Sequence, residues 1–385
     1  MKEYLDKLLS ELIQRCYVLK TLIKYPLKYS EFDGLAERCT HLIDSYIQDL
    51  KFLKRELSKF DNEGDLRIIF REYRQYLRLI EIVEHSGISV LNLHNDEMVF
   101  LNKLLRKIQL EINLPLSPPH IACFSNRYYF YQPLTNVIFT PLGESKFLLH
   151  LPDLFHELGH YISTKREEIK LTNVKKAYSN CLKAITEHYY LILRKQLSEV
   201  SPGQVAEITA GIHTQWKESW FEEFFCDVFA TCLLGPAYVW SHLHLVTKKV
   251  GNVFEFNWKA FSTHPADEAR LRIMTFCLDI LGFKDAVQEI LKQWNSLIVV
   301  KDIKPLPEYY EAYPDIILKM IAQNIINSIK DSDFSVYSKE KYSQIPNDDF
   351  INVLNEAWNV FWKGYDKFKI WESEKMDKLT KELNK

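Results

Sequence analysis

The chain has 385 residues, of which 47% are hydrophobic and 14% aromatic, so it can bury a sizeable core and wholesale disorder is excluded. Its formal net charge of −2 gives no electrostatic reason to expect nucleic acid as a partner. Only 11 glycines and 14 prolines occur, which favours a mainly helical protein.

The cysteines and the apolar segments bear on the compartment. Seven cysteines are scattered along the chain without a C-x-x-C pair, a pattern that predicts a reducing environment rather than a disulfide framework. Residues 1–16 carry acids among their apolar positions and do not look like a secretory signal. The longest apolar stretch, 224–240, is interrupted by Asp227, Gly235 and Pro236 and falls short of the roughly 20 residues that span a bilayer. We therefore expect a soluble, cytoplasmic protein without a membrane span.

The first region, residues 1–112, is predicted to be a bundle of long helices. Apolar side chains recur every three or four residues over 5–19, 35–57 and 66–80, and a fourth helix is expected over about 96–112. Packing within the bundle explains these stripes. A protein partner bound to the helices is the alternative.

The second region, residues 113–300, begins where the composition becomes rich in proline. Two β-prone runs within 126–141 predict a hairpin or small sheet. Its edge either pairs with an extended substrate or is purely structural. Helices are then expected in five segments: about 153–164, 171–199, 202–234, 265–281 and 285–297.

The third region, residues 301–385, is predicted to hold two long helices separated by a polar loop near 330–348. The last helix would carry an aromatic stripe between Trp358 and Trp371. Such a stripe at helical spacing is typical of core packing, and a ligand site is the alternative.

The most informative motif is His156-Glu157-Leu158-Gly159-His160, an instance of H-E-x-x-H. On a helix, positions four apart share a face, so both imidazoles can bind one metal ion. Glu157 lies close enough to reach a water molecule at that metal. Gly159 inside a helix costs about 1 kcal/mol relative to alanine, which a close approach by another chain or by substrate would explain.

A zinc site needs a third protein ligand and an open position. No histidine follows His160 at the short spacing that some metalloproteases use, so a later acid is required. Glu223 and Asp227 share a helical face, so Glu223 can bind the metal while Asp227 accepts the second ring N–H of a ligand histidine. Glu222 and Glu218 are the competing candidates.

A further element lies at residues 262–270. Pro265 is predicted to be the first residue of a helix, with His264 immediately before it. His264 and Arg270 would then face the metal. The alternative is an ordinary helix start followed by a surface arginine.

Together, the segments HELGH, EEFFCD and STHPADEAR resemble the three signature blocks of the HtpX-like and CAAX-prenyl-protease-like gluzincin metallopeptidases, over roughly residues 120–282. The resemblance implies a zincin-like catalytic core in 113–300 within a mainly α (α+β) chain. It implies one Zn²⁺ ion bound by His156, His160 and Glu223, with Glu157 as general base. It also implies that His264 and Arg270 lie near the active centre.

These observations predict a zinc-dependent endopeptidase of narrow specificity that hydrolyses a protein or peptide substrate. His264 or Arg270 would stabilise the oxyanion. Alternatively, His264 is a fourth, displaceable zinc ligand that keeps the enzyme latent. A hypothesis of another class is a catalytically silent, zinc-stabilised interaction module with a partner on its N- or C-terminal helices.

Overall fold

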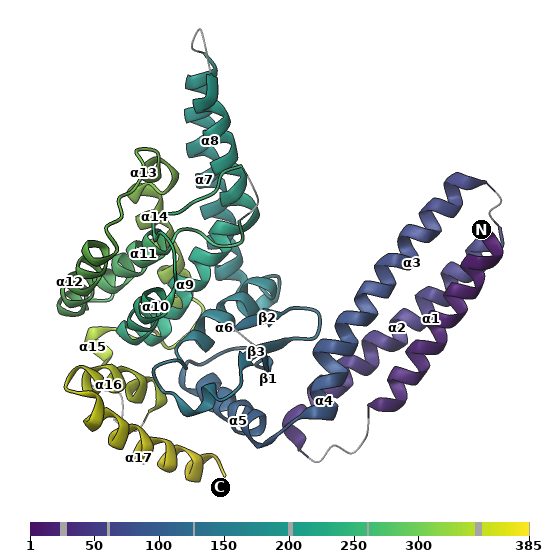
Figure 1. Ribbon diagram of the computed structural model, residues 1–385, viewed down its shortest axis with the longest axis horizontal. Coiled ribbons are helices and arrows are strands. Elements are labelled where there is room, and N and C mark those ends of the chain that lie inside the picture. The colour runs from purple at the N-terminus through teal and green to yellow at the C-terminus, as the bar shows by residue number, and fades with distance from the viewer. Residues whose placement is uncertain are drawn as a thin grey trace. The chain divides into compact units, whose positions relative to one another are not determined.

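The computed structural model describes residues 1–23, 29–59, 62–125, 128–198, 203–259, 262–342 and 349–384. The chain forms two compact units. Unit 1 comprises Met1–Leu104 and Pro119–Gly143, and unit 2 comprises Leu105–Pro118 and Glu144–Lys385. Helices account for 75% of the residues and, within these described ranges, accompany one small sheet, which confirms a mainly α protein (Figure 1). The division at 112/113 and 300/301 cuts the chain differently and stays a prediction.

Unit 1 begins with α1 (Lys2–Leu22), α2 (Asp33–Leu57) and α3 (Glu63–Val83), which lie side by side (Figure 1). Each buries part of the apolar stripe predicted from its periodicity, such as Leu5, Leu12 and Cys16 of α1, although Leu66, Tyr73 and Leu77 of the α3 stripe stay partly exposed. Shorter elements follow: the π-helical turn η2 (Glu84–Ile88), α4 (Ser89–Leu93) and the part of α5 (Asp96–Glu111) up to Leu104, with a 3-10 turn η1 (Ser30–Phe32) before α2.

The sheet of unit 1 has the strand order β1–β3–β2. β2 (Phe130–Gln132) pairs antiparallel with β3 (Val137–Pro141), so the predicted hairpin is confirmed, although residues 126–127 of the predicted run lie outside the described residues. β1 (His120–Ser125) runs parallel to β3 and was not predicted. The side-chain amide of Asn102 bonds both the N–H and the C=O of Ile121 in β1 and so blocks this strand's outer edge there.

Unit 2 is built around two helices in close contact, α6 (Asp153–Thr164) and α9 (Phe221–Leu234). Every residue of α9 except Glu222 is buried, so this helix forms the centre of the unit. The chain reaches α9 through α7 (Thr172–Leu197), α8 (Gly203–Gln215) and the π-helical turn η5 (Trp216–Trp220). The predicted start at Pro202 lies outside the described residues. Two 3-10 turns, η3 (Glu144–Lys146) and η4 (Ile169–Leu171), flank α6.

Several boundaries in the rest of unit 2 differ from the predictions. Pro236 begins a further helix, α10 (Pro236–Lys248), because proline fits the first helical turn, where no backbone donor is required. Pro265 is not the first residue of its helix, since α11 (Asp267–Ile280) starts at Asp267. The aromatic stripe is divided between two helices at Gly364, whose φ of 132° interrupts the helix.

The remaining helices of unit 2 are listed here with their bounds: α10 (Pro236–Lys248), α11 (Asp267–Ile280), α12 (Lys284–Lys301), α13 (Tyr309–Ala312), α14 (Asp315–Lys330), α15 (Lys339–Tyr342), α16 (Phe350–Trp362) and α17 (Tyr365–Leu383). The predicted polar loop near 330–348 contains α15, and its residues 343–348 lie outside the described part of the chain. Within the described ranges, no helix combines the length and the apolar character needed to cross a lipid bilayer.

Candidate metal centre

Gly159 sets the distance between α6 and α9. A Cβ atom added to Gly159 would lie 2.7 Å from Cα and 2.9 Å from Cβ of Cys226, both far inside ordinary contact distance. The close approach that was expected from another chain or a substrate is thus made by α9 of the same chain. Because the helices touch here, the histidines of α6 lie directly against the acidic side chains of α9.

His156 and His160 both present Nε2 to the carboxylate of Glu223. Nε2 of His156 lies 3.4 Å from Oε2 of Glu223, and Nε2 of His160 lies 3.5 Å from Oε1. His156 and Glu223 are buried and His160 is partly exposed. The structure therefore brings together the three side chains predicted to bind the metal.

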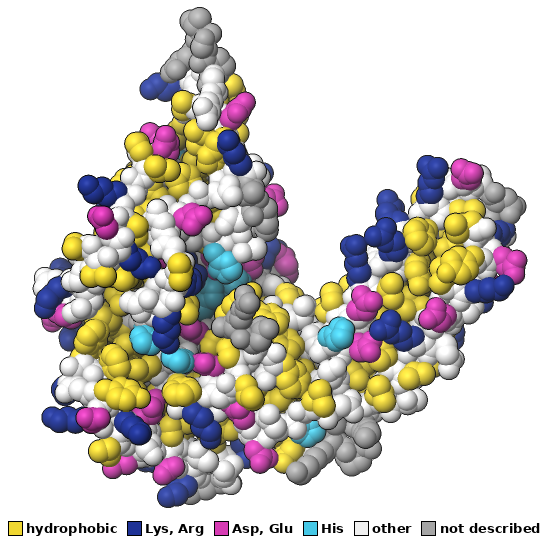
Figure 2. All heavy atoms as spheres, viewed as in Figure 1, with side chains coloured by type: hydrophobic (Ala, Val, Ile, Leu, Met, Phe, Trp, Pro, Cys, Tyr) yellow, Lys and Arg dark blue, Asp and Glu magenta, His cyan; other side chains and the backbone are white. Residues whose placement is uncertain are grey.

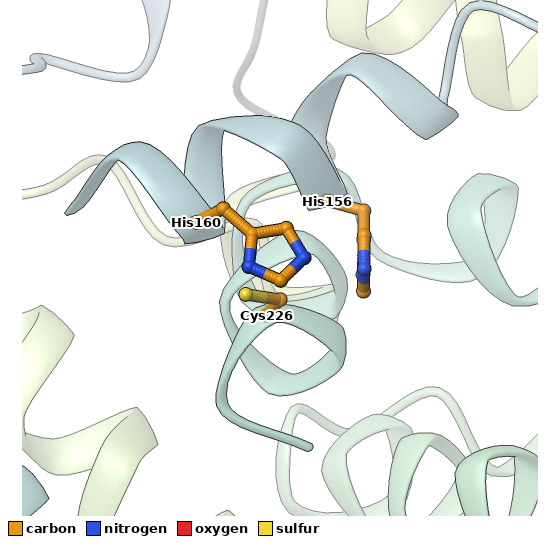
Figure 3. Close-up of side chains that lie close together, drawn as sticks. All are labelled: His156, His160 and Cys226. Atoms are coloured by element: carbon orange, nitrogen blue, oxygen red, sulfur yellow. The ribbon is translucent and has the colours of Figure 1, made fainter. Parts of the chain in front are cut away.

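Cys226 belongs to the same place. The ligand atoms of His156, His160 and Cys226 all lie within 4.8 Å of one another, close enough to hold a metal ion. In Figure 3 the thiol lies beside the ring of His160, on the side away from His156. Burial, and then the charge of Glu223, raise the pKa of the Cys226 thiol well above its usual value, which disfavours the thiolate that a metal requires.

Asp227 lies behind His156, one helical turn after Glu223. Its Oδ1 is 3.1 Å from Nδ1 of His156, on the opposite side of the ring from Glu223. Arg270 of α11 donates two hydrogen bonds to this carboxylate, from Nε to Oδ2 at 2.8 Å and from Nη2 to Oδ1 at 2.7 Å. Arg270 also lies 3.9 Å from Glu223. The predicted residues Asp227 and Arg270 thus meet His156 in one buried network.

Tyr238 of α10 completes the network and was missed by sequence analysis. Its hydroxyl donates to Oδ1 of Asp227 at 2.6 Å and lies 3.0 Å from Nδ1 of His156. No local pattern marks this tyrosine, because α10 itself was not predicted.

The two competing acids occupy different places. Oε1 of Glu222 lies 3.6 Å from Nδ1 of His160, the nitrogen on the far side of the ring from Glu223. The contact with His160 lowers the pKa of Glu222 and outweighs burial. Glu218 is exposed on η5. The arrangement favours Glu223 over both as the residue that faces the two Nε2 atoms.

Glu157 is buried at the centre, whereas His264 lies on its open side. Oε2 of Glu157 is buried and has no hydrogen-bond partner among the described residues, and burial raises the pKa of this carboxyl. The His264 side chain is 60% exposed, and its Nε2 lies 3.7 Å from Oε2 of Glu223. Its Nδ1 contacts the hydroxyl of Thr263 at 2.8 Å.

Two side chains at the π-helical turn η5 hold the segment that carries His264. Oε1 of Gln215 accepts from the backbone N–H of Ser262 at 3.1 Å, and the hydroxyl of Ser219 donates to the carbonyl of Ser262 at 2.6 Å. Gln215 and Ser219 are four residues apart and the same helix continues into α9. The element that carries Glu223 thus also positions His264.

Buried charge is unbalanced at the centre. Glu157, Glu223 and Asp227 are buried carboxylates, and Arg270 is the buried cation against them, which leaves a net charge of −2 when both histidines are neutral. Burial opposes a charge on His156, but the adjacent carboxylates of Asp227 and Glu223 prevail and raise the pKa of His156 to about 10. Burial likewise opposes the charge of Glu223, yet His156 and His160 hold the pKa of Glu223 at about 2. The site thus attracts positive charge, as protons or as a cation.

Histidine side chains are visible on the face of unit 2 shown in Figure 2, together with acidic and basic groups. The exposed ring of His264 and the partly exposed ring of His160 are the parts of the centre that solvent reaches. Glu157, Glu223 and Asp227 lie deeper. The centre is therefore a mostly buried group of polar side chains that opens to solvent on one side.

Comparison of the chain with protein-family models, with curated proteins and with solved structures found no match.

Proposed function

We propose that the chain is a zinc-dependent endopeptidase with one metal site formed by His156, His160 and Glu223. The observation that carries the proposal is the spacing of the ligand atoms. Two atoms bound at about 2.1 Å to a tetrahedral zinc ion lie about 3.4 Å apart. The two Nε2 atoms lie 3.4 and 3.5 Å from the nearest oxygens of Glu223.

Other features of the residues fit a divalent cation. Oε2 of Glu157 and Oε2 of Glu223 are buried without a hydrogen-bond partner in the described part of the chain, an arrangement that is costly unless another group satisfies them. The net charge of −2 on the buried groups matches a dication. Two imidazoles and a carboxylate are a donor set that suits zinc. Cys226 is the alternative third ligand, although its raised pKa disfavours it.

The zinc ion, when bound, would supply Lewis acidity for a peptide carbonyl and make a water molecule more acidic. Glu157 follows the first histidine and has a raised pKa, so it is suited to take a proton from the attacking water and pass it to the leaving amine. His264 is exposed, its Nε2 lies 3.7 Å from Glu223, and it is suited to donate a hydrogen bond to the developing oxyanion.

Arg270 takes a different part in this proposal. Its guanidinium is buried and makes two hydrogen bonds to Asp227. We therefore assign it to holding Asp227 in place, and through Asp227 to orienting His156. Direct contact with substrate is left to His264, which solvent reaches. The similarity to gluzincin metallopeptidases and the zincin-like core that it implies belong to the same proposal.

The test is Glu157→Gln, which keeps the shape of the side chain and removes its basicity. The variant should fold, bind zinc as the wild type does and lose hydrolysis of a fluorogenic peptide library. Glu167→Gln, which changes an exposed acid of the same unit, is the matched control and should retain activity. A Glu157→Gln variant that still cleaves would contradict the proposal. So would a wild-type chain that binds zinc but shows no chelator-sensitive hydrolysis, the result expected of an interaction module.

A further inference from the structure

The hydroxyl of Tyr238 joins His156 to Asp227 in the interior of unit 2. It lies 2.6 Å from Oδ1 of Asp227 and 3.0 Å from Nδ1 of His156. Tyr238 is 2% exposed and Asp227 is fully buried, so water does not compete for these bonds. Tyr238, which is not among the proposed metal ligands, thus contacts Nδ1 of His156, the ring nitrogen that does not face the metal site.

The position of each hydrogen follows from the partners. Asp227 is a carboxylate that accepts from Nε and Nη2 of Arg270, so it has no proton to give. Tyr238 must therefore be the donor in its short contact with Asp227. The hydroxyl oxygen then has only lone pairs left for His156, so the proton between them sits on Nδ1 of the imidazole.

We propose that Tyr238 is a positioning residue for the metal site. Together with Asp227 it holds the His156 proton on Nδ1 and directs the lone pair of Nε2 towards Glu223, where the metal would bind. The inference rests on the proposed metal site and deepens it. It assigns the orientation of one ligand to a helix, α10, that contributes no ligand.

The hydroxyl, rather than the ring, carries this role. The ring of Tyr238 stacks on His156 with an interplanar angle of 16° and a centroid separation of 6.2 Å. A Tyr238→Phe variant keeps this stacking and removes one oxygen atom. Without the hydroxyl, Asp227 is the remaining acceptor for the Nδ1 proton, at 3.1 Å, and it loses one of its own donors.

The first measurement is the affinity of Zn²⁺ and Co²⁺ by chelator competition, together with the visible spectrum of the cobalt-loaded chain. Tyr238→Phe should weaken binding by about tenfold, within the range of about 10–100-fold typical of groups that orient a ligand. It should also shift the cobalt bands, because the His156 ring is less constrained. Tyr189→Phe is the matched control, since it removes another buried hydroxyl, which donates to the carbonyl of Ala312 at 2.9 Å. This control should leave affinity and spectrum unchanged.

A second measurement needs no metal. In the chelated wild type, the Tyr238 hydroxyl proton should give a slowly exchanging downfield NMR resonance that is missing in Tyr238→Phe. Absence of this resonance, or equal affinities and cobalt spectra for Tyr238→Phe and the wild type, would overturn the inference. If the wild type binds neither ion, the proposed metal site fails. The NMR result then still decides whether Tyr238 donates to Asp227.

Discussion

Replacing Gly159 with alanine tests the packing on which the metal site depends. The new Cβ would lie 2.7 Å from Cα of Cys226, and carbon atoms prefer about 3.5–4.0 Å, so α6 and α9 must separate locally by roughly 1 Å. The contact is with backbone, which cannot swing away as a side chain can. Overpacking of this kind costs about 1–3 kcal/mol. The higher helix propensity of alanine offsets about 1 kcal/mol of this destabilisation.

The expected net destabilisation of Gly159→Ala is therefore up to about 2 kcal/mol, and each kcal/mol lowers the Tm by about 2–4 °C in a unit of this size. Zinc affinity and the rate of peptide hydrolysis should fall as well. The Nε2–carboxylate distances of 3.4 and 3.5 Å would lengthen, and a misplacement of about 1 Å can cost about 100-fold in rate. Calorimetry, chelator competition and peptide hydrolysis measure the three effects.

Two further variants separate this explanation from others. Gly64→Ala is the control, because its Cβ would meet only the side-chain oxygen of Asn62 at 3.2 Å, and it should be neutral or slightly stabilising. Cys226→Ala should not rescue Gly159→Ala, since the shortest contact is with the backbone and survives. A Gly159→Ala chain as stable and as zinc-competent as the wild type would refute the reasoning.

Three other predictions concern the ligands, the pH dependence and the buried ion pair. Glu223→Gln should abolish zinc binding while Cys226→Ser changes it less than about threefold, and the reverse pattern by chelator competition would make Cys226 the third ligand. Burial, followed by the charge of Arg270, lowers the pKa of His242 to about 4, so the folded chain holds this residue neutral while the unfolded chain protonates it near pH 6.5. This stabilisation, at most about 3 kcal/mol, is present above about pH 6.5 and is lost as the pH falls towards 4. The free energy of unfolding of chelated His242→Gln, measured with denaturant, should therefore depend less steeply on pH than that of the wild type. An unchanged slope would contradict the assignment of this pH dependence to His242. Arg270→Gln leaves the buried charge of Asp227 without its cation and should destabilise by about 3–5 kcal/mol in the same unfolding assay, and a loss below about 1 kcal/mol would show that the pair is not needed.

Local patterns account for most of what was predicted correctly. The helices of unit 1 were predicted because each apolar stripe is a property of its own segment. β1 was missed because two prolines precede it, and they indicated only the end of a helix. α10 was missed because Gly235-Pro236 is a frequent end of a helix, whereas here Gly235, with a φ of 68°, is followed directly by a new one.

The residues of the candidate site likewise divide into those that a local pattern predicts and those that depend on how the helices pack. The spacing of His156 and His160 follows from one helical turn, and so does the spacing of Glu223 and Asp227. Glu222 and Glu223 could not be ranked with certainty from sequence, because the choice depends on how α9 is rotated against α6, a difference of about 100° between neighbouring residues. The hydroxyl of Tyr238 reaches Asp227 only because α10 turns back beside α9, and no local pattern encodes that return.

The way the chain alternates between the two units affects the order of its synthesis and folding. It leaves unit 1 after Leu104, returns at Pro119 and leaves again after Gly143. The ribosome adds about 5–20 residues per second. The helices of unit 1 are synthesised first, but the unit cannot be completed until the strands of its sheet have also been synthesised. A fragment that ends at residue 112 lacks all three strands, and one that begins at 113 lacks the part of unit 2 contributed by α5. Neither unit can therefore be produced whole by a single cut, and expression of either one alone requires a designed linker across the gap.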